Sequence, residues 1–164
     1  MNSENTLLHT NQFAPHYDAY MAKTYWYGPE MLFGLMHEYI QSGQNLLDLG
    51  IGTGLSSVAF SRAGINIYGI DGSEEMLKIC REKLFAIDLR VADLSHFKMP
   101  YQQALFDHAI SMGVFHLVGN LGSVFSEVAR CLVNDGVFAF TTLQYLPGIE
   151  SGYEKTHIEG IFRR

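Results

Sequence analysis

The sequence is poor in the features that mark secreted and membrane-spanning proteins. Its 164 residues include only two cysteines, and no apolar run approaches the ~20 residues that a membrane-spanning helix needs. Residues 1–6 show no basic segment leading into an apolar one, so no signal peptide is visible. We therefore expect a cytoplasmic protein without a structural disulfide and without a membrane partner.

Positive charge and metal-ligand patterns are also scarce. The formal net charge is −6, and because phosphate neutralisation needs a basic surface, nucleic acid is not an expected partner. The seven histidines are scattered without H-x-H, H-E-x-x-H or paired-cysteine spacing, which predicts no metal site. The G-x-S-x-G motif of serine nucleophiles is missing as well.

Apolar residues, in contrast, are abundant and regularly arranged. Hydrophobic residues make up 48% of a chain that is long enough for one buried core and too short for two comfortable domains. Short apolar runs alternate with segments of helical spacing, which predicts an α/β fold with a doubly wound, mainly parallel sheet and helices on both faces. The predicted strands are 46–49, 66–70, 87–91, 106–111 and 137–141.

The two ends of the chain differ from this central pattern. Residues 1–12 are polar and without period, so we expect them to fray, and helices should begin near Phe13 and Gly28. The prediction is a single domain over 1–164. It consists of N-terminal helices in 1–43, a ligand-binding core in 44–143 and a C-terminal region in 144–164.

The most unusual stretch is N-L-L-D-L-G-I-G-T-G-L-S-S (45–57), in which Gly50, Gly52 and Gly54 follow a buried strand. Each glycine inside an element costs roughly 0.5–1 kcal/mol relative to alanine, so such a cluster indicates unusual backbone angles or close approach to a ligand. A strand, a glycine turn and a helix N-terminus form a ready ligand site beyond the carboxyl end of the sheet. Asp71 closes the next strand about 20 residues on, where an acidic side chain can bind a ribose diol.

Two kinds of nucleoside cofactor fit a glycine turn followed by an acidic residue. The dinucleotide fingerprint is G-x-G-x-x-G/A, but here the spacing is G-x-G-x-G and Leu55 occupies the position of the final small residue. Asp48, just before the turn, would lie awkwardly beside a pyrophosphate. A cofactor with a positive centre and no phosphate suits this carboxylate better, and a nicotinamide-dependent oxidoreductase is the less favoured alternative.

The motif D-L-G-I-G-T-G resembles the first motif of class I S-adenosylmethionine-dependent methyltransferases. Four further segments resemble the later motifs of that family, in the family's order, and the match covers roughly 13–143. The branch most similar is the small-molecule one, with its ubiquinone-type and generic methyltransferases. These segments are I-D-G-S-E-E-M-L (70–77), V-A-D-L (91–94), F-D-H-A-I-S-M-G-V-F-H-L (106–117) and R-C-L-V-N-D-G-V-F-A-F-T (130–141).

The resemblance implies a Rossmann-like methyltransferase domain with S-adenosylmethionine as its cofactor. The backbone at Gly50, Gly52 and Gly54 would pass close to the methionine part of the cofactor. Asp48 would face its ammonium group, through water or a backbone amide, and Asp71 would accept both ribose hydroxyls. The alternative for Asp71 is a helix-capping role.

The same resemblance implies roles for residues farther along the chain. Gly72 and Met76 would border the adenine, while Asp93 and Leu94 would bind its amino group; for Asp93 a plain turn role is the alternative. Ser111 and Met112 would form the floor below the sulfonium, and Tyr17 in the N-terminal helices would belong to the lid. His116 would be a candidate base. His116 could also simply line the substrate pocket or cap a helix.

The acceptor is less clearly encoded than the cofactor. Ser111-Met112-Gly113-Val114 stands where amino-methylating relatives carry Asn or Asp followed by Pro-Pro, so DNA bases and peptide glutamines are poor candidates. We expect methyl transfer to a small molecule by in-line displacement. The alternative is a non-catalytic cofactor-binding or interaction module with the same fold.

Relatives of this type continue past the fifth strand with a helix and an antiparallel hairpin. Only about twenty residues follow Leu143, which is too few for both, so the hairpin is expected to be missing. The strand 137–140 would then form an open apolar edge of the kind that invites pairing. This predicts a longer natural chain or a second chain over that edge, and a possible homodimer through it.

Overall fold

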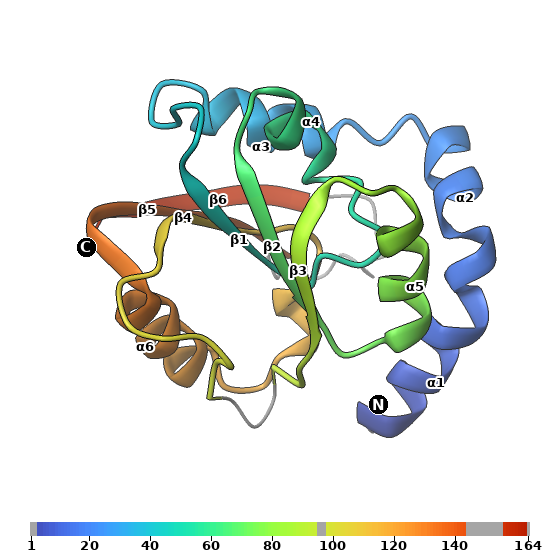
Figure 1. Cartoon of the computed structure of the whole chain (residues 1–164). Helices are drawn as coiled ribbons and strands as arrows, with labels where there is room; N and C mark the ends of the chain where they lie inside the picture. Colours follow the sequence, from blue (N-terminus) through green and yellow to red (C-terminus); the bar gives the residue numbers. More distant parts are fainter. Residues whose placement is uncertain (1–2, 95–97, 144–155, 164) are drawn as a thin grey trace.

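The computed structural model describes residues 3–94, 98–143 and 156–163, which form a six-stranded sheet in the order β3-β2-β1-β4-β5-β6 (Figure 1). Strands β1 to β5 pair in parallel, as the alternating pattern predicts, and β6 is antiparallel. The helices, including the 3-10 turns η1 and η2, are α1 Ser3–Phe13, η1 Ala14–His16, α2 Tyr17–Lys23, α3 Gly28–Met36, α4 Val58–Arg62, α5 Glu74–Glu82, η2 Phe115–Leu117 and α6 Leu121–Cys131. The strands are β1 Asn45–Leu49, β2 Asn66–Asp71, β3 Ala86–Val91, β4 Phe106–Ser111, β5 Leu132–Leu143 and β6 Thr156–Arg163.

The strand order reverses direction at β1, which pairs with β2 on one side and with β4 on the other. The chain first builds outward from β1 to β3 and then crosses back to β4. In open α/β sheets the crevice beyond the carboxyl ends of the strands at such a reversal is where ligands bind. The glycine turn follows β1 directly, so it occurs at this reversal point.

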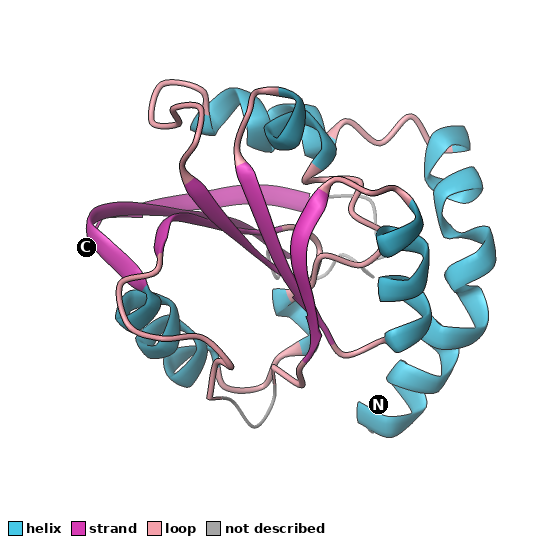
Figure 2. Ribbon diagram, viewed as in Figure 1, coloured by secondary structure: helices cyan, strands magenta, loops and turns pink. Residues whose placement is uncertain are grey.

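Alternate residues of β1 face the two helical layers of the protein. Leu47 and Leu49 join the core that α6 completes, whereas Leu46 joins the core formed with α3, α4 and α5. Figure 2 shows these helices on opposite faces of the sheet. Because side chains alternate along a strand, Asp48 shares its face with Leu46, so a carboxylate occupies a position that is otherwise apolar.

The N-terminal residues do not fray as predicted, because α1 spans Ser3–Phe13 and runs on through η1 into α2. Leu7, Asn11 and Ala14, at helical spacing, are the residues that dock this segment onto the body of the protein. Ala14 is almost completely buried, and Asn11 accepts a hydrogen bond from Ser73. The prediction considered only the spacing of apolar residues and did not consider Asn11, a polar residue that contacts the body of the protein. The sequence after the glycine turn predicts a helix over 55–63, but α4 begins later, at Val58.

The prediction of an open fifth-strand edge is wrong. Strand β6 pairs antiparallel with β5, from Val137 opposite Arg163 to Leu143 opposite Thr156. The last residues cannot supply a two-stranded hairpin, but one strand beside β5 needs only backbone N–H and C=O groups in register. A homodimer through the edge of β5 would have to displace β6. The dipeptide Pro147-Gly148, which favours a turn, lies outside the described residues.

His108, at the amino end of β4, is held in its neutral form by two contacts. Val137 N donates to its Nδ1 over 3.3 Å, and Nε2 lies 3.1 Å from Gln44 Oε1, so the proton belongs on Nε2. Burial lowers the pKa of His108, since the charged ring would lose its hydration. Protonation of His108 at Nδ1 would also place its N–H opposite the N–H of Val137, so that two donors would face each other.

This arrangement predicts that the protein loses stability in mild acid. Because the pKa of His108 is lower in the folded state, the unfolded chain binds the proton first, and stability falls as the pH drops below the ordinary pKa of about 6.5. Urea unfolding at pH 5.5 and pH 8 should show a smaller acid loss for His108→Gln than for the wild type. The same substitution at the exposed His16 is the control, and an unchanged acid loss in His108→Gln would contradict the assignment.

Candidate functional site

The three glycines of the turn have different tasks, although all have positive φ angles. A Cβ on Gly50 would lie 2.3 Å from Val114 Cγ2, and one on Gly54 would lie 2.5 Å from Phe85 Cζ. Among the described residues, nothing lies within 4 Å of a Cβ on Gly52. Gly50 and Gly54 therefore permit packing against distant side chains, and Gly52 is the one that borders open space where a ligand can approach.

Asp71, at the end of β2, is oriented by two backbone amides. Gly52 N donates to its Oδ2 over 2.8 Å, and Ser73 N donates to its Oδ1 over the same distance. Burial raises the pKa of Asp71, while these two hydrogen bonds act in the opposite direction. A carboxylate has about four acceptor positions, so each oxygen keeps one lone pair for a hydroxyl. The geometry fits the diol-binding role predicted for Asp71.

Asp48 is a buried carboxylate that is only half satisfied. Ser57 Oγ donates to its Oδ2 over 2.7 Å, but Oδ1 has no hydrogen-bond partner among the described residues. Burial, reinforced by the nearby charge of Asp71, raises the pKa of Asp48 to about 7. A buried unpaired carboxylate oxygen costs free energy, and a cationic donor would relieve that cost. The group therefore fits the predicted ammonium-facing role.

The other residues predicted around the ribose and adenine lie at the carboxyl ends of β2 and β3. Tyr17, the predicted lid residue, is in α2 near Asp71, and its pKa is raised to about 12 by burial and by the charges of Asp18 and Asp71. Met76 is buried in the first turn of α5. Gly72 borders Leu7 and the carbonyl oxygen of Ala92. Beyond β3, Asp93 is exposed and Leu94 is buried.

The predicted floor of the site lies at the ends of β4 and β5. Ser111 Oγ donates to the carbonyl of Leu49 over 2.8 Å and so links the ends of β4 and β1. Met112 is buried, and its sulfur accepts a hydrogen bond from Thr141 Oγ1, which also accepts one from Gly113 N. Thr141 thus holds the residues of the predicted floor in place, a role that the sequence reasoning missed.

His116 lies in η2, which packs beside β5. His116 is exposed as a whole, but partial burial of its ring lowers its pKa, so the ring is neutral at pH 7 and able to accept a proton. It follows β4, whereas Asp48 lies in β1 and Asp71 ends β2.

Sequence reasoning also missed the residues that hold the turn in place. They are Asp18 in α2, Thr53 between the glycines, Ser57 behind Asp48, Ser73 and Lys83. Asp18 and Asn11 are seven positions apart and could have been found by searching for a polar stripe on the first helices.

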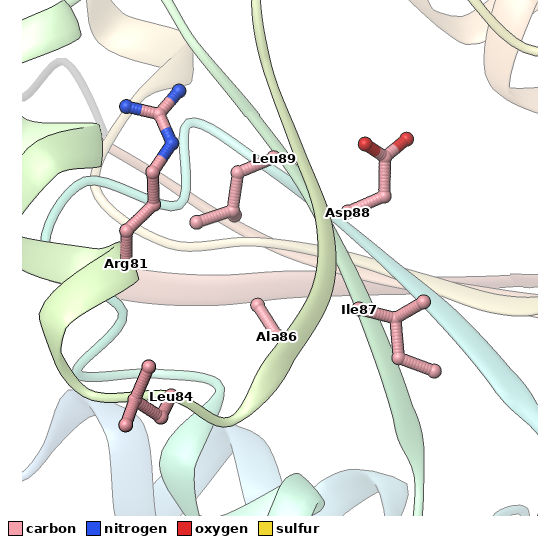
Figure 3. A pocket seen from close by; sticks show the side chains of 6 residues that line it. All are labelled: Arg81, Leu84, Ala86, Ile87, Asp88 and Leu89. Carbon is pink, nitrogen blue, oxygen red and sulfur yellow. The ribbon is translucent and has the colours of Figure 1, made fainter.

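A separate hollow of about 390 Å³ lies along β3 and the end of α5 (Figure 3). None of the predicted cofactor residues lines it. The residues lining the hollow are Arg81, Leu84, Ala86, Ile87, Asp88 and Leu89.

Within the described ranges, no helix is both long and apolar enough to cross a membrane. In the same ranges no cluster of at least three His, Cys, Asp or Glu residues is arranged to hold a metal.

Comparison with known proteins decides the family. The model of the family described as "Methyltransferase domain" matches residues 47–140, from β1 to β5. The chain belongs to this methyltransferase family. The resemblance to class I S-adenosylmethionine-dependent methyltransferases and the predicted fold are thereby confirmed, and the oxidoreductase alternative is set aside.

Individual relatives agree with the family. The ubiquinone biosynthesis O-methyltransferase of Actinobacillus pleuropneumoniae is 30% identical over 143 residues, which cover 75% of this chain and 61% of the relative. A Haloferax volcanii protein solved in complex with the Trm112 methyltransferase activator matches with TM-score 0.71 and 26% identity, over 80% of this chain and 59% of that one. An S-adenosylmethionine-dependent methyltransferase from Mesorhizobium loti matches with TM-score 0.59 and 29% identity, over 67% of this chain and 52% of that one. The chain thus spans only part of each.

The distinct tasks of the glycines predict distinct costs. Gly50→Ala should destabilise the domain by about 2–4 kcal/mol, because the new Cβ meets Val114 and the backbone is left-handed. Adding Val114→Ala should restore part of this loss. Gly52→Ala should cost only the backbone strain of about 1–2 kcal/mol. Chemical denaturation of the four proteins, wild type included, measures this, and equal costs at Gly50 and Gly52 would contradict the division.

Asp48→Asn should stabilise the ligand-free protein at pH 8, by an amount on the order of 4 kcal/mol. The folded pKa of about 7 lies above the unfolded value of 3.8, so stability falls as the pH rises between them, and the substitution removes that loss. Below pH 4 the gain should vanish, which serves as the internal control. A gain that is equal at pH 4 and pH 8 would show that ionisation is not the cause.

Proposed function

We propose that this protein binds S-adenosylmethionine and transfers its methyl group to a small-molecule acceptor. The observation that carries the proposal is a buried carboxylate, Asp48, together with a half-buried one, Asp71, which binds the amide of a glycine that borders open space. A cofactor with a cationic amino acid end and a ribose diol satisfies both carboxylates at once. A pyrophosphate would place further negative charge beside Asp48.

The residues present would divide the cofactor between them. Asp71 would accept the ribose hydroxyls on the lone pairs that its two backbone amides leave free, and Asp48 Oδ1 would accept from the ammonium group. Gly72, Met76, Asp93 and Leu94 would enclose the adenine. The bound cofactor supplies an electrophilic methyl group that needs no further activation.

The remaining task of the protein is to align the acceptor and exclude water, which can supply several kcal/mol of the barrier reduction. Ser111 and Met112 would form the floor beneath the reacting groups and Tyr17 the cover. Because His116 is neutral at pH 7, it can take the proton of a hydroxyl acceptor if the acceptor binds beside η2.

The relatives and the charge support one class of acceptor. The Actinobacillus relative is an O-methyltransferase of ubiquinone biosynthesis, and the net charge of −6 disfavours a nucleic acid acceptor. A small molecule with a hydroxyl group is the class we propose. Cys80 and Cys131 are buried and free, which agrees with the reducing cytoplasm expected for this protein.

Cofactor binding is tested most directly at Asp71. Asp71→Ala should weaken S-adenosylhomocysteine binding by more than about tenfold, measured by calorimetry, because the ribose hydroxyls lose their acceptor and Gly52 loses its anchor. Asp88→Ala is the control, since Asp88 pairs with Arg90 on β3 and does not contact the turn. Undiminished affinity in a folded Asp71→Ala protein would refute the assignment.

Turnover distinguishes an enzyme from a binding module with the same fold. The wild-type protein should form S-adenosylhomocysteine from S-adenosylmethionine when offered a panel of small hydroxylated acceptors. His116→Asn should lower turnover more than cofactor affinity if the histidine is the base. Tight cofactor binding without turnover on any acceptor would favour the non-catalytic alternative.

A further inference from the structure

The N-terminal arm, defined as residues 3–23, touches the body of the protein at the residues that form the candidate cofactor site. Leu7 lies against Gly72, Asn11 Oδ1 accepts from Ser73 Oγ over 2.6 Å, and Asp18 Oδ1 accepts from Thr53 Oγ1 over 2.5 Å. With the buried Ala14, the contacts recur at helical spacing on one face of the arm. Figure 1 shows the arm running alongside α5.

Asp18 makes the shorter of the two hydrogen bonds, and it also forms an ion pair. Its second oxygen, Oδ2, lies 2.6 Å from Lys83 Nζ, and the same ammonium group donates to the carbonyl oxygen of Thr53 over 2.7 Å. Asp18, Thr53 and Lys83 therefore form a closed triangle between the arm, the glycine turn and the end of α5. Thr53 is almost completely buried, whereas the side chains of Asp18 and Lys83 are 37% and 26% exposed.

The glycine turn is thus held by two carboxylates. Asp71 binds the amide of Gly52 from β2, and Asp18 binds the hydroxyl of the next residue, Thr53, from the arm. Because successive residues of one short turn are fixed from both sides, a change in the position of the arm alters the turn, and a ligand seated on the turn favours the docked arm. Such coupling is reciprocal in free energy.

We propose that Asp18 is a positioning residue that latches the N-terminal arm onto the glycine turn, so that undocking of the arm governs how fast the cofactor leaves. The part that concerns the cofactor rests on the proposed function. The latch itself is a property of the ligand-free protein. Leu7 and Asn11 each contact one place on the body of the protein, whereas Asp18 joins the arm both to the glycine turn at Thr53 and to Lys83 at the end of α5.

The test compares four variants with the wild type. Asp18→Ala removes both contacts of the latch, Asp18→Asn keeps an acceptor for Thr53 but loses the charge that binds Lys83, and Lys83→Met removes the ammonium group. Lys78→Met is the matched control, because Lys78 is on the same helix and forms an exposed ion pair with Glu75 at 2.5 Å that does not involve the arm.

The first readout is amide hydrogen exchange of α2 and of Gly54 in the protein without ligand. Asp18→Ala should accelerate exchange at both sites by about tenfold, Asp18→Asn and Lys83→Met should do so less, and Lys78→Met should match the wild type. Unchanged exchange in Asp18→Ala would overturn the latch. This readout does not depend on any cofactor.

The second readout is the dissociation rate of S-adenosylhomocysteine, measured by displacement. The rate should rise by about tenfold in Asp18→Ala, in the same order across the variants as the exchange data. A dissociation rate within about twofold of the wild type, together with a loosened arm, would overturn the gating role. If the wild type binds no S-adenosylhomocysteine, the proposed function and the gating role fail together, and hydrogen exchange alone decides the latch.

Discussion

The hydrogen bond from Gly52 N to Asp71 Oδ2 is the contact on which the site depends. It ties the turn after β1 to the end of β2, the neighbouring strand, and it fixes the carboxylate and the turn relative to each other. The bond also explains the need for glycine at position 52, since the amide reaches Asp71 with a φ of +55°, where other residues are strained. A local backbone requirement and a ligand-binding group are thus joined in a single contact.

The two carboxylates around this contact are costly for the ligand-free protein. Asp48 occupies a position on β1 whose neighbour on the same face, Leu46, belongs to the apolar core, and one of its oxygens has no partner within the described residues. The negative charges of Asp48 and Asp71 also repel each other. A fold retains such groups where a ligand later compensates them, and strongly perturbed acidic groups accordingly gather at functional sites.

The periphery of the sheet completes the domain on both sides. The arm brings Tyr17 and Asp18 to the cofactor end, and β6 provides β5 with an antiparallel neighbour. In both cases residues far from the central strands in sequence supply contacts that the strands cannot supply themselves. The arm contributes through single polar side chains, whereas β6 contributes through backbone pairing.

The sequence by itself determined the central strands, the glycine turn and the acidic residues that close β1 and β2, because apolar period and glycine spacing are local signals. It also identified the family through the order of its motifs. Only the tertiary structure decided which glycine borders open space. Val114 packs against Gly50 and Phe85 against Gly54, and both side chains come from distant parts of the chain. The pairing of β6 and the docking of the arm were likewise decided by long-range contacts. No short window of sequence contains both partners of such a contact.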